Sequence, residues 1–392
     1  MRKEIKQIFL LSALIYFLQG IKSLPSQPLF YYFRETLHLS VSKIMYLTSI
    51  TTLAWIIKPI YGFISDSFPI KGYRRKSYIF ISALTSVILY LLLGSITLSL
   101  YFLIGLMLME SFAGAFRDVA IDGLMVEKGK KFNITGKIQS VQWGFLTVAG
   151  LLTGVLGGYI SQHFNYKIAY LLLLPFPISI LIASFYTSEA IYINKKRRFL
   201  KIVTSSSLSL LRLFKDSNFT MSSLFLFLLW LSPAIGTPYM NKLRYDLHLS
   251  KITIGWVYTL PSLSAIIGAI LYYKVSQKIN LKKWLYISTI ISTLSTLAYL
   301  YLTIKLVFVY AFLFGLSGMF THLLVMDFMA RTCKKGNEAT IFAMLCSLVN
   351  FAGWLSILIG AKLYTLVHFN GLIIISALFT LGCLLVIPKI KV

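Results

Sequence analysis

Five ionisable side chains lie within long apolar stretches of the chain, where a charge is costly. Lys58 and Arg117 are bases, and Glu110, Asp118 and Asp122 are acids on a single stretch. Because an ionised group in hydrocarbon loses its hydration, such residues usually serve binding or transport. The two bases predict a site for an anion. A carboxyl group removed from water holds its proton more readily, so each acid is a candidate proton carrier.

The spacing of these residues indicates which of them share a helix face. Glu110 and Arg117 are seven residues, or two turns, apart, so we expect a side chain from another helix to connect them rather than direct contact. Asp118 and Asp122, four residues apart, occupy a second face. Pro59 disrupts helical hydrogen bonding and predicts a kink beside the buried lysine. The alternative is that these charges pair with one another and only brace the helices.

The segment that follows Lys58 has the residues of a conformational gate. Gly62 and Asp66 are followed by Gly72 and by the basic pair Arg74 and Arg75, in a short polar connection between two apolar stretches. The aspartate can pair with bases on a neighbouring loop in one conformation and release them in another. We therefore predict that residues 62–75, called the gate segment below, open and close one side of the protein.

The remaining chemistry-bearing residues indicate neither an enzyme nor a metal site. Asp327, on an apolar stretch of the second half, is one more candidate proton carrier. The three cysteines (Cys333, Cys346 and Cys383) have no metal-ligand or disulfide spacing and are expected to be small buried residues. No phosphate-binding loop or Ser-His-Asp set is present. We expect no catalytic residue, metal or cofactor.

Composition places these residues in a membrane protein. The 392 residues are 57% hydrophobic and only 13% charged, against roughly 25% charged in soluble domains. This balance excludes a soluble enzyme, a disordered chain and a disulfide-rich secreted domain. Runs of about 20 apolar residues predict membrane helices. Twelve such runs cover residues 8–33, 41–64, 76–96, 98–124, 138–161, 167–187, 219–241, 252–273, 284–302, 306–330, 340–365 and 370–388.

The net charge of +26 is explained by topology. With twelve spans both termini share one side, and 27 of the 38 lysines and arginines fall on that side against nine on the other. Positive residues concentrate in cytoplasmic loops, so both termini are predicted to be cytoplasmic. The nine include residues at helix ends, and Lys58 and Arg117 are the two bases that are assigned to neither side. We expect no nucleic-acid partner. No cleavage site follows the first apolar run, which is therefore expected to be a membrane helix, and the short tails without a transit peptide favour a bacterial inner membrane.

An internal repeat divides the chain into two related halves. Residues 28–40 align with residues 238–250, with six identities in thirteen positions. The longest polar stretch, residues 188–217, separates residues 1–187 from residues 218–392. Two six-helix halves in parallel repeat, with a substrate site between them, are typical of the major facilitator superfamily. We therefore predict an all-α membrane protein with twelve transmembrane helices in two pseudo-symmetric halves.

Residues 55–78, which run from Trp55 through Lys58-Pro59 and Asp66 to Arg74-Arg75, resemble the folate–biopterin transporter family of this superfamily. Residues 31–40, 118–127 and 335–350 support the resemblance. It implies proton-linked uptake of folates or pterins. The positions that match family motif sites are Lys58, Asp66, Arg74, Arg75, Asp118 and Asp122.

The chemistry of folate fits this resemblance. Folate carries a carboxylate tail, which suits Lys58 and Arg117, and a flat pterin ring, which suits an aromatic side chain such as Trp55. The expected partners are an anionic folate or pterin, protons and the lipid bilayer, and the protein is expected to be a monomer. Two alternatives stay open. One is a transporter of another organic solute (a nucleotide, sugar or peptide fragment), and the other is a non-transporting membrane receptor on the same fold.

Overall fold

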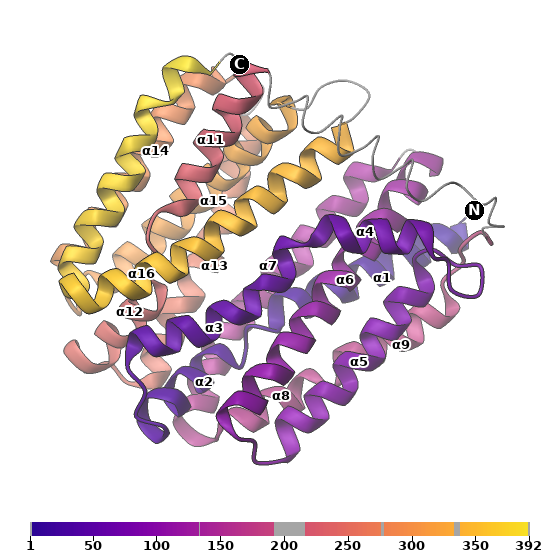
Figure 1. Cartoon of the computed structure of the whole chain (residues 1–392), viewed down its shortest axis with the longest axis horizontal. Helices are drawn as coiled ribbons and strands as arrows, with labels where there is room; N and C mark the ends of the chain where they lie inside the picture. The colour runs from indigo at the N-terminus through magenta and orange to yellow at the C-terminus, as the bar shows by residue number, and fades with distance from the viewer. Residues whose placement is uncertain (1, 133, 192–215, 276–277, 333–337, 391–392) are drawn as a thin grey trace. The chain divides into compact units, whose positions relative to one another are not determined.

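The computed structural model describes residues 2–132, 134–191, 216–275, 278–332 and 338–390. Within these ranges every regular element is helical (Figure 1). Ten helical segments of the described residues are long and apolar enough to cross a membrane. The protein is therefore an all-α, multi-pass membrane protein. Residues 192–215 of the predicted central loop and residues 335–337 of the third supporting motif lie outside the described ranges.

The chain divides into two compact units, each described by itself. Unit 1 comprises Met1–Leu37 and Ile50–Phe199, and unit 2 comprises His38–Ser49 and Leu200–Val392. The elements of unit 1 are α1 (Arg2–Ile21), α2 (Ser26–Tyr31), the π-helix η1 (Tyr32–Thr36), the second part of α3 (Val41–Ile56), α4 (Lys58–Ser67), α5 (Lys76–Ser95), α6 (Leu100–Phe132), α7 (Thr135–His163), α8 (Tyr166–Leu173) and α9 (Pro175–Tyr186).

Unit 2 contains the first part of α3 and the remaining helices. They are α11 (Ser217–Leu231), α12 (Gly236–Asn241), the π-helix η2 (Lys242–Asp246), α13 (Lys251–Val275), α14 (Leu281–Ala298), η3 (Tyr299–Tyr301), α15 (Val307–Thr332), α16 (Glu338–Gly382), η4 (Cys383–Leu385) and η5 (Ile387–Lys389). Its core is built from apolar side chains of α11, α13, α14, α15 and α16, including Phe225 and Phe328.

Three of the twelve predicted spans do not match the ten segments one to one. Residues 284–302 correspond to α14, an 18-residue helix that is not among the ten. Residues 340–365 and 370–388 lie on one long helical segment, α16, because the chain stays helical up to a single break. His368 makes that break, with φ 54° and ψ −164°.

The predicted kink at Pro59 is confirmed as a break between two helices. Ile57, with φ −93° and ψ 21°, separates α3 from α4. Lys58 and Pro59 then form the first positions of α4, where a missing backbone N–H costs nothing because the first amides of a helix have no partner within it. The break sets Lys58 at the start of a new helix rather than within a continuous one.

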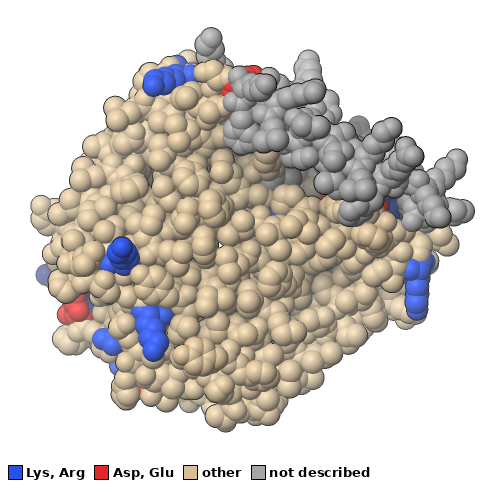
Figure 2. Space-filling view, viewed as in Figure 1, with Lys and Arg blue, Asp and Glu red and all other residues tan. Residues whose placement is uncertain are grey.

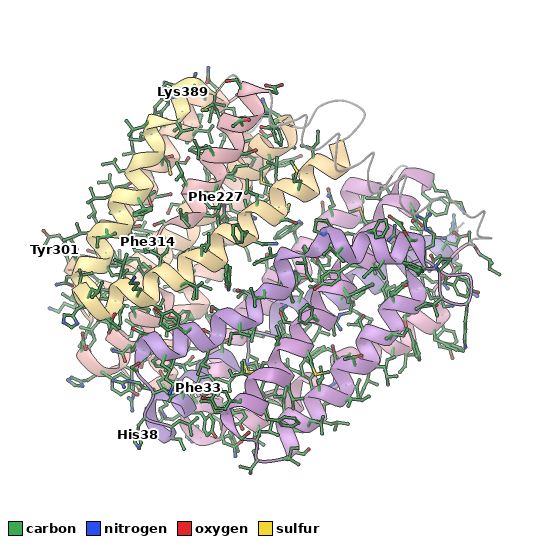
Figure 3. All side chains as sticks on the ribbon, viewed as in Figure 1. Phe33, His38, Phe227, Tyr301, Phe314 and Lys389 are labelled. Carbon is green, nitrogen blue, oxygen red and sulfur yellow. The ribbon has the colours of Figure 1, made fainter. Side chains whose placement is uncertain are left out.

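The sequence repeat at residues 28–40 and 238–250 has the same local structure in both copies. Each copy runs from a six-residue helix, α2 or α12, into a five-residue π-helix, η1 or η2. His38 and His248 follow these turns with φ near 50°, in the left-handed region that commonly ends a helix. Figure 3 labels His38 at its turn.

The surface of the described residues agrees with a lipid environment. Large apolar side chains such as Leu91, Phe102, Ile182 and Leu294 are exposed. In the space-filling view, residues other than Lys, Arg, Asp and Glu cover most of the visible surface of the described residues (Figure 2). A water-soluble protein would need a polar covering here, whereas lipid tails accept these side chains.

Candidate functional site

Helix α6 carries four of the predicted site residues. Its 33 residues include Glu110, Arg117, Asp118 and Asp122. Glu110, Arg117 and Asp118 are buried, each less than 10% exposed. The acids and the base therefore point into unit 1, where neighbouring helices supply their partners.

Lys58 and Asp118, both predicted from the sequence, form an ion pair. Lys58 Nζ lies 2.5 Å from Asp118 Oδ2, and the aspartate side chain is only 4% exposed. The same ammonium lies 4.9 Å from the ring centroid of Trp55. Trp55 Nε1 donates a hydrogen bond of 3.1 Å to Ser111 Oγ, which fixes the plane of the indole ring. The structure thus brings together a base, an acid and the aromatic ring proposed for substrate.

Arg117 and Glu110 form a second group of charges. Arg117 Nη1 donates to Ser86 Oγ at 2.8 Å, and Tyr90 Oη donates to Glu110 Oε1 at 2.9 Å. Ser86 of α5 also contacts Glu110, at 3.3 Å, so the predicted connection through another helix is confirmed. The expectation of no direct contact was wrong, because Arg117 Nη2 reaches within 3.8 Å of Glu110 Oε1. Gly114 lies between them and leaves space for both side chains.

A third base, Lys22, belongs to the same region and was missed as a site residue. Its Nζ lies 4.1 Å from the ring centroid of Trp55, on which Lys58 also rests. The charge count assigned Lys22 to the non-cytoplasmic side, although it lies within the predicted span 8–33. That position in the sequence was the signal that could have identified it.

Asp122 has polar partners rather than a base. Tyr16 Oη donates to Asp122 Oδ1 at 2.8 Å, and Gln142 Nε2 donates to the same oxygen at 3.4 Å. Among the described residues no lysine, arginine or histidine nitrogen lies within 4.0 Å of this carboxyl group. Asp122 therefore differs from Asp118, whose charge is balanced by Lys58.

The gate segment forms a network of charges. Asp66 accepts hydrogen bonds from the guanidinium groups of both Arg74 and Arg75, the latter at 2.6 Å. Arg75 also contacts Ser65 Oγ and, at 3.4 Å, Glu127 Oε1. Asp66 thus pairs with bases of its own segment rather than with bases of a neighbouring loop, and Glu127 joins the network from the end of α6.

Glycines give the gate segment its shape. Gly72 has φ 81°, a backbone conformation that residues with a side chain rarely adopt. It permits the tight turn in which Ile70 and Tyr73 exchange backbone hydrogen bonds of 3.0 Å. A Cβ added to Gly123 would lie 2.6 Å from Arg75 Cζ, so this glycine admits the guanidinium group. Gly62 is less constrained, since an added Cβ would meet Val119 at an ordinary 3.6 Å.

Glu189 is a second member of the network that sequence reasoning missed. Its carboxylate accepts hydrogen bonds from three successive backbone N–H groups, those of Arg74 at 3.0 Å, Arg75 at 3.0 Å and Lys76 at 2.7 Å. Free N–H groups and the helix dipole make the start of a helix favourable for a carboxylate. Glu189 thereby attaches the start of α5 to the segment that leaves α9. One glutamate in a polar stretch gives no sequence signal for this role.

Asp327 belongs to unit 2, whereas the charged residues around α6 belong to unit 1. Its carboxylate accepts hydrogen bonds from Arg331, four residues on, at 3.1 and 2.8 Å, and from Tyr272 at 3.2 Å. Unit 2 also contains an apolar cavity of about 220 Å³ lined by aromatic residues that include Tyr239, Tyr299 and Phe314. Figure 3 labels Phe314. In the described part of the chain no group of three acids, histidines or cysteines could hold a metal ion.

Comparison with known proteins identifies the family. The model of the BT1 family matches residues 19–387, nearly the whole chain. The chain belongs to the BT1 family. A folate-biopterin transporter of Synechocystis is 27% identical over 95% of this chain and 79% of its own length. Folate transporter 1 of Plasmodium falciparum is 26% identical over 90% of this chain and 72% of its own length.

Solved structures give the fold of this BT1 member. The nucleoside transporter NupG superposes with a TM-score of 0.77 and 14% identity, covering 98% of this chain and 99% of its own. A D-xylose–proton symporter superposes with a TM-score of 0.74 and 12% identity, covering 99% and 98%. The BT1 chain thus has the fold of these major facilitator superfamily transporters. It is a transporter and not an enzyme, as the sequence predicted.

Proposed function

We propose that this BT1 protein takes up folate or a related pterin by proton symport with alternating access. The observation that carries the proposal is the mixed cluster of bases and acids inside unit 1. Its members are Lys22, Lys58, Arg117, Glu110, Asp118 and Asp122. Burial of so many ionisable groups in a membrane protein costs free energy, and residues that are kept at such a cost usually serve binding or transport. The names of the cyanobacterial and Plasmodium relatives point to folate as the anion.

The charges of the cluster support a role in binding an anion together with protons. With every group ionised, the three bases balance the three acids, so a substrate carboxylate adds uncompensated negative charge. Uptake of a proton by one acid offsets that addition. Asp122 suits this role because tyrosine and glutamine contact it instead of a base, while Glu110, Asp118 and Asp327 each have a basic partner.

The proposed topology has twelve spans in two halves of six. We count α14 and the two parts of α16 on either side of His368 as separate spans. Residues 1–187 and 218–392 then form the halves, and residues 188–217 connect them. The excess of lysine and arginine on the side of the termini supports a cytoplasmic location for both ends, in a bacterial inner membrane.

The gate segment is proposed to hold one side closed through Asp66, Arg74 and Arg75. Replacement of Asp66 by asparagine removes the charge that both arginines contact. We expect Asp66→Asn to abolish uptake while the protein still reaches the membrane. Wild-type uptake by this variant would contradict the proposed gate.

Uptake of labelled folate into proteoliposomes tests the proposed function. We expect folate and biopterin to accumulate faster with an inward proton gradient than without one. Nucleosides and xylose, which the names of the structural neighbours suggest, serve as competitors. Absence of specific folate or pterin uptake would reject the substrate, and uptake indifferent to the gradient would reject only the proton coupling.

A further inference from the structure

Lys22 stands out in unit 1 because of how it is held. Its ammonium group lies over the face of Trp55, 4.1 Å from the ring centroid. Lys58, on the same ring, is bound to Asp118 at 2.5 Å. Among the described residues no carboxylate oxygen lies within 4.0 Å of Lys22 Nζ. The ammonium group of Lys22 therefore makes a cation–π contact with Trp55 and forms no ion pair with a described carboxylate.

The space beside Lys22 is bounded by two further charged groups. A Cβ at Gly114 would lie 3.7 Å from Lys22 Nζ, 3.8 Å from Arg117 Nη2 and 3.9 Å from Glu110 Oε1. Two positive groups and one negative group therefore meet around a residue that has no side chain. The local excess of positive charge favours an anion.

The neighbours of this space differ in how firmly they are fixed. Arg117 is held through Nη1 by Ser86 and by the Ser82 carbonyl oxygen, and Glu110 is held by Tyr90. Their geometry is therefore set before any ligand arrives. Lys22 has a long flexible side chain and is half-buried, so it can leave the ring for an arriving carboxylate.

We propose that Lys22, together with Nη2 of Arg117 across Gly114, recognises a carboxylate and so selects carboxylate-bearing substrates over uncharged ones. In the bound state a charge-assisted hydrogen bond to the carboxylate replaces the cation–π contact of Lys22. This inference rests on the proposed function and deepens it, because it names the substrate class of the same site.

Carboxylate binding also prepares Trp55 for an aromatic ring. When Lys22 turns to the carboxylate, the face of the indole that it covered becomes available. The hydrogen bond from Trp55 Nε1 to Ser111 keeps the ring plane in place. The preferred substrate is therefore an aromatic acid, with a flat ring a few bonds away from its carboxylate.

The test compares two probes of nearly the same shape: labelled folate, and labelled folate whose carboxyl groups are converted to uncharged amides. Equilibrium binding is measured on the purified full-length protein. We expect the wild type to bind folate at least tenfold more tightly than the diamide. In Lys22→Gln the preference should fall to less than threefold because only folate binding weakens, and Lys22→Arg should retain it.

Glycine variants of α6 keep the inference testable if Lys22→Gln does not fold. Gly114→Ala places a methyl group at ordinary contact distances of 3.7–3.9 Å, so it fills the proposed carboxylate site without a clash and should also abolish the preference. Gly105→Ala is the matched control on the same helix, since apart from the nearby backbone of α6 and the two neighbouring residues no described atom lies within 4 Å of its added Cβ. It should bind both probes like the wild type.

The outcomes separate this inference from the proposed function. A wild type without preference for folate over the diamide, or a preference that survives both Lys22→Gln and Gly114→Ala, overturns the role of Lys22 and leaves folate transport standing. A wild type that binds neither probe and takes up neither folate nor biopterin overturns the proposed function itself.

Discussion

The attachment of Glu189 to the start of α5 leads to a quantitative prediction. Glu189→Ala removes the acceptor of three backbone hydrogen bonds, at residues 74, 75 and 76. Hydrogen bonds to a charged group contribute about 1.5–3 kcal/mol each when buried. Glu189 is half-buried and water can replace the lost carboxylate, so the loss is closer to that of a helix N-cap, about 2 kcal/mol in total.

Hydrogen exchange of these three amides measures that loss. About 2 kcal/mol corresponds to roughly a 30-fold fall in protection, since 1.4 kcal/mol is a factor of ten. Glu189→Gln keeps one neutral acceptor, and neutral hydrogen bonds are about half as strong, so its protection should fall only about fivefold.

The control for the Glu189 prediction is Glu35→Ala, which removes an exposed glutamate elsewhere in unit 1. Its exchange at residues 74–76 should equal that of the wild type. Unchanged exchange in Glu189→Ala would refute the reasoning, because the amides would then not depend on the carboxylate. Equal loss in the alanine and glutamine variants would show that charge contributes nothing.

Three further predictions concern single contacts. Gly123→Ala should lower thermal stability and reduce folate uptake at least tenfold, because its Cβ would lie 2.6 Å from Arg75 Cζ. This clash should outweigh a gain in helix propensity of about 1 kcal/mol, and a thermal stability above that of the wild type would contradict the prediction. Lys58→Gln leaves Asp118 buried without its cation, which costs about 3–5 kcal/mol. Adding Asp118→Asn should recover most of the thermal stability but not uptake, and an additive loss would argue against the pair. His368→Gly should raise the melting temperature, because φ 54° with ψ −164° costs a non-glycine residue about 1–3 kcal/mol; a lower one would show that the imidazole is needed.

The sequence predicted the helical membrane fold because apolar runs depend only on local composition. It also predicted the break beside Lys58, since Pro59 acts on its own helix. The sequence also predicted the break within α16, since the predicted spans 340–365 and 370–388 lie on either side of His368. The left-handed conformation of His368 itself was not predicted, because it depends on the local backbone and not on apolar composition.

Most residues of the charged cluster could be predicted from the sequence, but their contacts with one another could be predicted only in part. Buried acids and bases are conspicuous in an apolar chain, so Lys58, Arg117 and Asp118 were identified individually. Their partners depend on helix packing: Tyr90 reaches Glu110 from another helix, and only the structure gives that approach. Spacing along one helix did not predict the approach of Arg117 to Glu110, since long side chains bridge two turns across a glycine.

The paired turns at His38 and His248 bear on how the chain is made. Each turn is closed by hydrogen bonds between near neighbours, from Leu37 to Tyr32 and from Leu247 to Lys242, both 3.0 Å. Contacts so close in sequence form quickly and need no distant part of the chain. The first turn can therefore form during synthesis, more than two hundred residues before the ribosome reaches its counterpart. Each copy of the repeat can therefore form its turn from local contacts alone, independently of the other copy.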